Sequence, residues 1–303
     1  MELSKYFKRE IHSILSTNAY NKILNRYRKI MRAYRITSSP WRALPNFIIA
    51  GAQKSGTTSL YRYLLSHPQI IGIYPHRPDK QTTWGKEVHY FDENFDKPEW
   101  WYRFHFPLRL ELIRKDSITG EASPEYLYHP RGAKRIASTV PDAKIIICLR
   151  NPVGRAISNY WHQVRLKNET LSMRKAFEKE EERIGKDKIS NNEEEFFYNE
   201  NRKKFSYLDK GIYADQVARY YKFFDRSQVL IIKSCKLFRD TQLTFNRVVD
   251  FLGISSYKLE NIDKHNSGSY RKVEHSLKKE LKEYFKYHNQ RLYDIIDVDS
   301  PWW

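Results

Sequence analysis

The chain has 303 residues, of which 40% are hydrophobic and 15% aromatic, and it carries a formal net charge of +18. This composition can build a core, which excludes a disordered chain, and the length allows at most two domains of about 150 residues each. The charge favours an anionic partner: nucleic acid, acidic polysaccharide, anionic lipid headgroup or nucleotide-like cofactor. The two cysteines, Cys148 and Cys235, exclude a disulfide-dense secreted scaffold and a cysteine-rich zinc module. Cys148 lies in an apolar run, so we expect a buried, inert thiol.

Apolar runs in the sequence are far shorter than the ~20 residues needed to span a bilayer. The N-terminus is basic and amphipathic but lacks the apolar region of a secretory signal. We therefore expect a cytoplasmic protein by default. A chain from which an anchor segment has been removed is the alternative.

Residues 1–40 are predicted to form a basic helical extension, because apolar side chains recur there at helical spacing. This extension either packs on the domain or a partner, or lies on an anionic membrane surface; its few large apolar residues favour packing or partner contact. Ser38, Ser39 and Pro40 end it. Residues 41–303 are then expected to form one domain.

Strand and helix patterns alternate through the remaining chain, with no internal repeat and no linker that would divide it. Short strands or apolar runs are expected at residues 45–50, 69–74, 87–91, 117–120, 144–149 and 228–232. One helix is expected to follow the glycine-containing segment at residues 51–56 and to end at about residue 67. Further helices are expected at residues 131–139, 153–167, 171–185, 213–224, 240–252 (capped by Gly253) and 274–294. The alternation predicts an α/β fold in which helices flank a parallel sheet. Residues 186–206 are interpreted as a mobile surface segment and residues 265–272 as a loop.

A phosphate-binding loop is predicted at residues 51–58, between a buried strand and a helix. Glycines allow the turn, and backbone N–H groups with the helix N-terminus hold an anion. A nucleotide-hydrolysing loop would continue with Lys and Ser/Thr after the second glycine, whereas Thr57 and Thr58 follow Gly56 here and Lys54 lies inside the loop. Such a loop suits a cofactor with an anionic end whose chemistry needs no metal. The alternative is a strand–helix turn without a ligand.

A second candidate phosphate contact follows the strand at residues 144–149. Arg150 stands at the carboxyl end of this strand, where α/β folds bind ligands, and its planar guanidinium suits a dianionic phosphate. Ser158 lies about two helical turns further on and could complete the cradle. The alternative is a surface arginine in an ion pair and a helical serine without a ligand.

Together the two motifs resemble those of sulfotransferases that use 3′-phosphoadenosine 5′-phosphosulfate (PAPS). The resemblance covers about residues 45–298 and implies a P-loop-like fold. It also implies cofactor contacts from the phosphosulfate loop and from the strand–helix motif, namely Lys54, Ser55, Gly56, Thr57, Thr58, Arg150 and Ser158. Lys54 would also donate to the transferred sulfuryl group as a catalytic residue.

Residues 86–92, with the sequence KEVHYFD, resemble the Glu-x-His-Phe-Phe-Asp region of heparan-sulfate-type glycan sulfotransferases. In that family the glutamate is the general base, which implies this role for Glu87, with His89 as a reserve base or positioning residue. Asp92 would orient Lys54 or His89. Without the motif, Glu87 would be an ordinary carboxylate paired with Lys86 or an arginine.

Two further segments resemble this family. Residues 120–126 resemble the substrate-cleft loop, although Glu121 or Ala122 replaces the lysine often found there. Residues 266–272 resemble the loop that closes over the cofactor, which implies contacts from Ser267, Gly268, Ser269, Tyr270 and Arg271.

The expected function is therefore sulfuryl transfer from PAPS to a hydroxyl or amine, with a glycan as the favoured acceptor and no metal. The aromatic residues near the catalytic motif would suit glycan stacking or the core equally: Trp84, Tyr90, Trp100, Trp101 and Tyr102. The alternative is a P-loop nucleotide kinase or other NTP-binding protein, which the missing Gly-Lys-Ser/Thr order argues against. A nucleic-acid binder has no supporting motif. The oligomeric state stays open.

Overall fold

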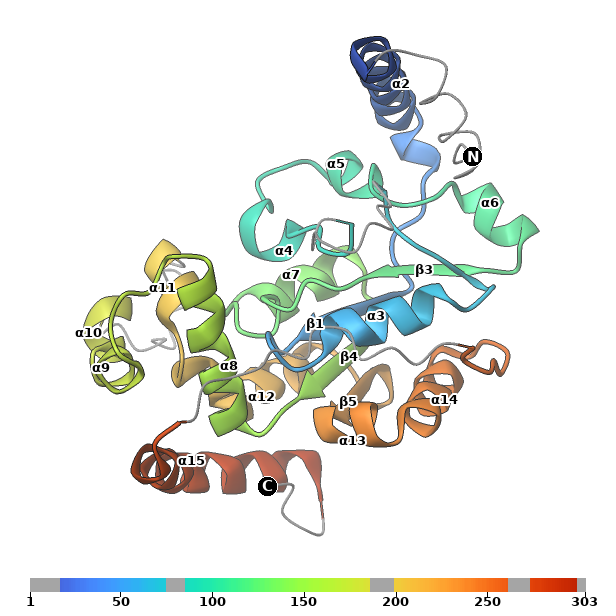
Figure 1. Cartoon of the computed structure of the whole chain (residues 1–303). Coiled ribbons are helices and arrows are strands. Elements are labelled where there is room, and N and C mark those ends of the chain that lie inside the picture. Colours follow the sequence, from blue (N-terminus) through green and yellow to red (C-terminus); the bar gives the residue numbers. More distant parts are fainter. Residues whose placement is uncertain (1–16, 75–84, 186–198, 261–272, 299–303) are drawn as a thin grey trace.

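The computed structural model describes residues 17–74, 85–185, 199–260 and 273–298 (Figure 1). Its centre is one five-stranded sheet in the order β2-β3-β1-β4-β5, with every neighbouring pair parallel. The strands are β1 (Phe47–Gly51), β2 (Ile70–Ile71), β3 (Ile118–Glu121), β4 (Lys144–Leu149) and β5 (Val229–Lys233). After β1 the chain builds β2 and β3 on one side of it, and it then builds β4 and β5 on the other side. The carboxyl ends of the neighbouring strands β1 and β4 therefore flank a topological switch point.

Helices cover both faces of the sheet because alternate residues of its central strands point to opposite sides. On one side, Ile48 and Ile145 pack with residues of α7 (Gly132–Thr139) and α12 (Tyr213–Phe223). On the other, Phe47, Ile146 and Cys148 pack with α3 (Thr57–Leu65), α13 (Ser234–Arg239) and α14 (Thr241–Leu252). Both central strands are therefore buried on both faces, as their continuous apolar sequences require.

A third apolar cluster involves α8 (Pro152–Arg165), α9 (Met173–Glu178) and α15 (His275–Ile296). Its buried members include Tyr160, Phe177, Tyr207 and Phe285. The other helices are α2 (Thr17–Thr37), α4 (Tyr90–Glu93), α5 (Glu99–Arg103), α6 (Arg109–Arg114), α10 (Glu180–Ile184) and α11 (Glu200–Phe205), with short 3-10 turns at Ser39–Trp41, Asp209–Gly211 and Arg226–Gln228. None of the described helices combines the length and apolarity that crossing a membrane requires.

The structure confirms the α/β fold with a parallel sheet, the buried strands β1, β4 and β5, and the long helices around them. It also confirms that Gly253, at a φ of 75°, ends α14. Cys148 is fully buried, and burial raises the pKa of its thiol to about 12. The thiol therefore stays protonated at neutral pH, as expected of an inert cysteine.

Three local predictions are wrong. Residues 87–91 do not form a strand: the chain runs irregularly to His89, whose φ of 54° is left-handed, and then enters α4. The predicted helix at residues 171–185 is two helices, α9 and α10, separated at Lys179. In the stretch interpreted as a mobile surface segment, Arg202 on α11 is only 4% exposed, because it packs near Tyr128 and Asp209. Residues 186–198 of that stretch lie outside the described residues.

The helix predicted within residues 1–40 is present as α2, and residues 1–16 lie outside the described part of the chain. Two buried arginines attach its C-terminal end to the domain. Arg35 donates to the carbonyl oxygens of Phe104 and Phe106 at 2.8 and 2.6 Å, and Arg42 donates to Phe106 at 2.9 Å. The division into residues 1–40 and 41–303 stays a prediction.

Candidate functional site

The predicted phosphate loop lies between β1 and α3, at the carboxyl edge of the sheet. Gly56 caps α3 with a left-handed φ of 93°, and a Cβ there would stand 2.9 Å from the ring of Phe238. A glycine is therefore required on both conformational and steric grounds. Ser55 and Thr57 are buried, whereas Lys54 and Thr58 are half-buried. The loop thus presents its lysine and the first turn of α3 toward the edge where ligands bind in this fold class.

Arg150 follows β4 directly and meets the loop from the adjacent strand. Its guanidinium donates to the carbonyl oxygen of Lys54 at 3.2 Å, so the two predicted anion-binding residues lie together. The hydroxyl of Tyr213 donates to the carbonyl of Arg150 at 3.0 Å and supports its backbone. Asn151 caps α8 by accepting from the amides of Val153 and Gly154 at 3.0 and 3.2 Å. Ser158, predicted from the same motif, lies on α8 and is 2% exposed.

Positive charge accumulates around Lys54. The pKa of Lys54 is lowered to about 8, mainly by burial and then by the charges of Arg165, Lys86 and Arg150, while Glu87 acts in the opposite sense. One carboxylate does not balance these cations, and the local excess of positive charge favours an anionic ligand. The same interaction places Glu87 within electrostatic range of the loop.

Glu87 and His89 lie side by side at the entrance to α4. His89 Nε2 is 3.0 Å from Glu87 Oε2, and His89 Nδ1 is 2.8 Å from Asp92 Oδ2. The ammonium group of Lys86 pairs with the other oxygen of Glu87. The structure therefore brings together both catalytic residues predicted in this motif, and it places Asp92 against His89.

These contacts set the charge state of the group. Burial opposes ionisation of Glu87, but Lys86 and His89 outweigh it and lower the pKa of Glu87 to about 2. Burial also opposes a charged His89, yet its hydrogen bonds to Asp92 and Glu87 raise the pKa of His89 to about 11. At neutral pH the imidazolium donates one N–H to each carboxylate, and Glu87 is an anion.

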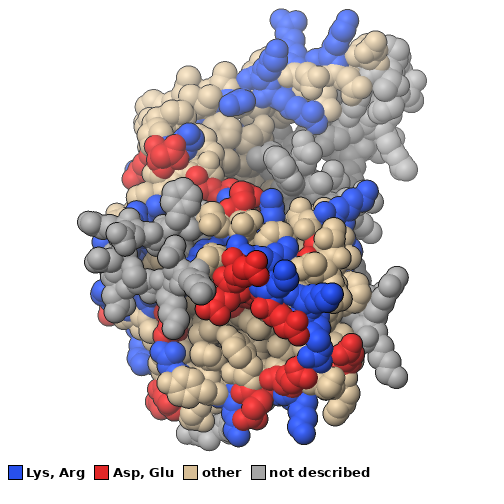
Figure 2. Space-filling model, turned by 90° about the vertical axis from the view of Figure 1, so that its left-hand side faces the viewer, with Lys and Arg blue, Asp and Glu red and all other residues tan. Residues whose placement is uncertain are grey.

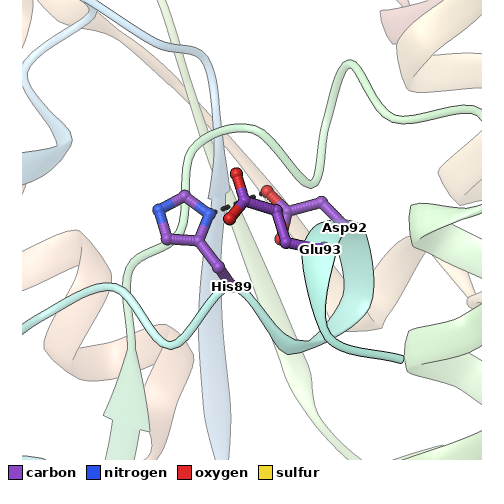
Figure 3. A group of neighbouring side chains, drawn as sticks. All are labelled: His89, Asp92 and Glu93. Carbon is purple, nitrogen blue, oxygen red and sulfur yellow. Dashed lines mark hydrogen bonds and ion pairs between the residues drawn. The ribbon is translucent and has the colours of Figure 1, made fainter. Parts of the chain in front are cut away.

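His89, Asp92 and Glu93 also lie close enough together to be considered as metal ligands (Figure 3). The ring of His89 points at the carboxylate of Asp92, and the dashed contact joins them. Lys203 pairs with Glu93 at 3.0 Å. An imidazolium that donates to two carboxylates has no lone pair for a metal, so we read the group as a hydrogen-bonded one.

A buried carboxylate that we did not predict as functional holds this segment in place. Glu121 accepts hydrogen bonds from the hydroxyls of Tyr102 and Ser123 at 2.6 Å, from Tyr126 at 3.1 Å and from the Val88 amide at 3.1 Å. The Ser123 hydroxyl oxygen accepts from the amides of Val88 and His89 at 3.0 and 3.2 Å. The amides of Val88 and His89 are therefore held by side chains from the last residue of β3 and from the loop that follows it.

His162 is a second residue that the sequence interpretation missed. It lies on α8 one turn beyond Ser158, a spacing that places both on the same helix face and that could have indicated it. Burial, together with the neighbouring charges of Lys54 and Arg165, lowers the pKa of His162 to about 4. His162 is therefore a neutral imidazole beside the cations of the loop at neutral pH.

The remaining predicted site residues divide into described and undescribed positions. Ser267, Gly268, Ser269, Tyr270 and Arg271 lie outside the described residues, as does Trp84. Of the aromatic residues, Tyr90 and Tyr102 are buried and stack with ring centroids 4.5 Å apart, so they belong to the core. Trp100 is 44% exposed and Trp101 is half-buried.

The fold and the two motifs predicted to bind anions indicate one class of protein, and comparison with known families confirms that class. The chain belongs to the sulfotransferase domain family, whose model matches residues 44–292. The solved structure of a sulfotransferase from Alicyclobacillus acidocaldarius is similar to it, with 34% identity, a TM-score of 0.62 and coverage of 85% of this chain and 98% of that chain. Family and fold favour the sulfotransferase interpretation over the P-loop kinase alternative.

The curated relatives include membrane-associated sulfotransferase kil1 of Dictyostelium discoideum, 26% identical over 86% of this chain and 66% of that protein. Human heparan sulfate glucosamine 3-O-sulfotransferase 3B1 is 25% identical over 86% of this chain and 65% of that protein. Heparan sulfate glucosamine 3-O-sulfotransferase 6 of Mus musculus is 30% identical over 76% of this chain and 58% of that protein. The chain thus spans somewhat less than two thirds of the length of these relatives.

Proposed function

We propose that the protein transfers the sulfuryl group of PAPS to a hydroxyl or amine of an anionic glycan. The observation that carries this proposal is the group of cations around Lys54, from three separate segments, with the carboxylate of Glu87 in electrostatic range. Cations that stabilise a moving anionic group, beside a carboxylate that accepts a proton, are what sulfuryl transfer requires.

The residues present fit the donor. The left-handed Gly56 turns the chain into the N-terminus of α3, whose first backbone N–H groups suit the 5′-phosphosulfate end. Arg150 and Ser158 suit the 3′-phosphate, as their match to the family motif implies. When bound, PAPS supplies the sulfuryl group together with a phosphate leaving group. Lys54 donates to the oxygens on which negative charge develops.

Glu87 accepts the proton of the acceptor's hydroxyl or amine, and His89 holds the Glu87 carboxylate in position. The charged ring of His89 has no lone pair, so it orients Glu87 Oε2 rather than acting as the base. A pKa of about 2 gives Glu87 little affinity for a proton, and Lys86 is the strongest cause that lowers it. An anion bound beside Lys86 shares that cation, which raises the pKa of Glu87 toward a useful value.

An anionic glycan fits the surroundings of this group. Four cations, Arg135, Arg131, Arg219 and Lys203, lie within electrostatic range of His129 in the loop after β3. Together with burial, which is the larger cause, they lower the pKa of His129 to about 3. Lys203 also pairs with Glu93, so this group of cations extends to α4. Relatives whose names specify heparan sulfate as acceptor support the same class of substrate.

A radiolabelled transfer assay tests the proposal. The protein is incubated with labelled PAPS and, in separate reactions, sulfated and unsulfated glycans, lipids and tyrosyl peptides, each with a metal chelator. We expect labelled glycan, with more label on acidic glycans than on neutral ones. Label only on lipids or peptides would overturn the acceptor class, and no transfer to any acceptor would overturn the activity.

A further inference from the structure

Helix α2 exposes an apolar stripe that the transfer reaction does not use. Ile23, Ile30 and Tyr34 are 54%, 60% and 47% exposed, and Tyr27 is 37% exposed. Successive spacings of four, three and four residues align these side chains along one helix face. Trp41, just beyond the helix, is 67% exposed. The folded domain therefore leaves large apolar side chains in contact with water.

The charge of α2 has one sign. Between Thr17 and Thr37 the sequence contains no aspartate or glutamate and six basic residues, which are Lys22, Arg26, Arg28, Lys29, Arg32 and Arg35. Figure 2 shows Lys and Arg side chains projecting at the upper end of the molecule, at the height at which Figure 1 draws α2. A helix with an apolar stripe and exclusively cationic charge is the combination found in helices that lie on membrane surfaces.

The attachment of α2 leaves this surface available. Arg35 is used for docking, since it donates to Phe104 and Phe106 and lies over the ring of Tyr74 at 4.4 Å. Arg42 lies over the ring of Tyr34 at 5.4 Å and fixes the C-terminal end of the stripe. Figure 1 shows the rest of α2 projecting from the domain, at the end opposite α15. The helix is thus anchored at one end and presented along its length.

We propose that α2 binds the surface of an anionic lipid bilayer and lies in the plane of the interface. Its stripe of Ile23, Tyr27, Ile30 and Tyr34 enters the boundary between headgroups and acyl chains, and its cations contact anionic headgroups. A soluble polyanion would engage the cations but leave the stripe in water. A second copy of the chain would bring two cationic helices together, which repel each other. An anionic bilayer satisfies both features, because it offers anionic headgroups beside an apolar layer.

Vesicle flotation of the full-length chain tests this proposal. We expect binding to phosphatidylcholine vesicles that contain phosphatidylserine, little binding to phosphatidylcholine alone, and release at roughly 0.5 M salt. The double variant Ile23→Asn/Ile30→Asn should lower the affinity at least about tenfold by removing inserted apolar area. Lys29→Glu/Arg32→Glu should lower it by a similar factor by reversing two charges.

Matched variants on other faces act as controls. Leu243→Asn on α14 removes a side chain that is 70% exposed, and Lys278→Glu/Lys282→Glu reverses two exposed charges on α15. Both should bind vesicles like the wild type. Absence of vesicle binding would overturn the proposal. Binding that depends on the charges but not on Ile23 and Ile30 would assign α2 to a polyanion. A dimer that the isoleucine variant dissociates in sedimentation would assign the stripe to a second copy.

Discussion

At the scale of single residues, Glu87 is the carboxylate that we propose as the base. Its charge acts on the pKa of Lys54, and the His89 ring lies 3.0 Å from one of its oxygens. The variant Glu87→Gln keeps the shape of the side chain but cannot accept a proton. We expect the sulfuryl-transfer rate to fall roughly 10²–10⁴-fold, the span typical of general-base catalysis, while binding of the product nucleotide 3′-phosphoadenosine 5′-phosphate (PAP) stays nearly unchanged.

Lys54→Ala is the comparison for this variant. We assign Lys54 to the 5′ end of the donor, so its loss should weaken both the rate and the binding of that end. The pair of variants therefore separates proton transfer from donor binding in one steady-state assay. Retention of more than about a tenth of the wild-type rate by Glu87→Gln would move the base elsewhere, and neutral His162 would be the next residue to test.

Lys86 controls the proton affinity of Glu87. Its ammonium group is the strongest influence that lowers the pKa of Glu87 to about 2, so Lys86→Gln should raise that pKa. A base works only when unprotonated, and the acidic limb of the pH–rate profile should therefore move to higher pH. The measurement is kcat against pH for both proteins. If the acidic limb stayed at the wild-type pH, the titration that limits the rate would belong to a group other than Glu87.

At the scale of secondary-structure elements, the junction of β1 and α3 depends on Gly56. Gly56→Ala forces a side chain into a left-handed backbone and places its Cβ 2.9 Å from Phe238. We expect a loss of roughly 1–3 kcal/mol in the free energy of unfolding and weaker PAP binding. Denaturant titration and calorimetry measure the two effects.

Gly253 supplies the control for backbone strain alone. Its φ is 75° in the same left-handed region, but a Cβ there meets the flexible end of Lys144 at 3.6 Å, an ordinary contact distance, so Gly253→Ala adds strain without a clash and lies outside the proposed site. We expect a smaller loss of stability than for Gly56→Ala, and unchanged PAP binding. Equal losses of stability in the two variants would mean that the Phe238 side chain moves away from the added Cβ without a cost in free energy.

The elements also divide into those that the sequence could predict and those that it could not. Buried strands such as β4, and a glycine turn before a helix, are local patterns, so the sheet and the strand–turn–helix geometry of both motifs were predictable. Residues 87–91 were mistaken for a strand because the amides of Val88 and His89 are held by the side chains of Glu121 and Ser123, more than 30 residues away. Contacts at this separation leave no periodic signal.

At the scale of the whole molecule, part of the positive charge lies in two separate places, which we assign to different partners. Cations around Lys54 come from segments that the sheet topology brings together, whereas those of α2 follow one another along a single helix. The cations around Lys54 are far apart in the sequence and come together only in the folded chain, whereas those of α2 can be recognised in the sequence alone. Salt should accordingly weaken the two interactions independently, since they lie on separate parts of the molecule.

A ligand that binds only the folded chain stabilises the whole domain, and this gives a direct measurement of the proposed donor site. PAP at about one hundred times its dissociation constant should raise the midpoint of thermal unfolding by roughly 4 °C without added metal. ATP with magnesium is the control for the kinase alternative and should produce a smaller shift.

Arg150 tests which part of the nucleotide is recognised. Its guanidinium is held at the loop by the carbonyl of Lys54, and we assign it to the 3′-phosphate. Arg150→Ala should weaken PAP binding by on the order of 2–4 kcal/mol, because a dianionic phosphate loses a charged partner. Adenosine 5′-phosphosulfate lacks the 3′-phosphate, so calorimetry should find its affinity almost unchanged. Equal weakening of both ligands would instead make Arg150 a structural support of the loop, acting through Lys54 on the 5′ end.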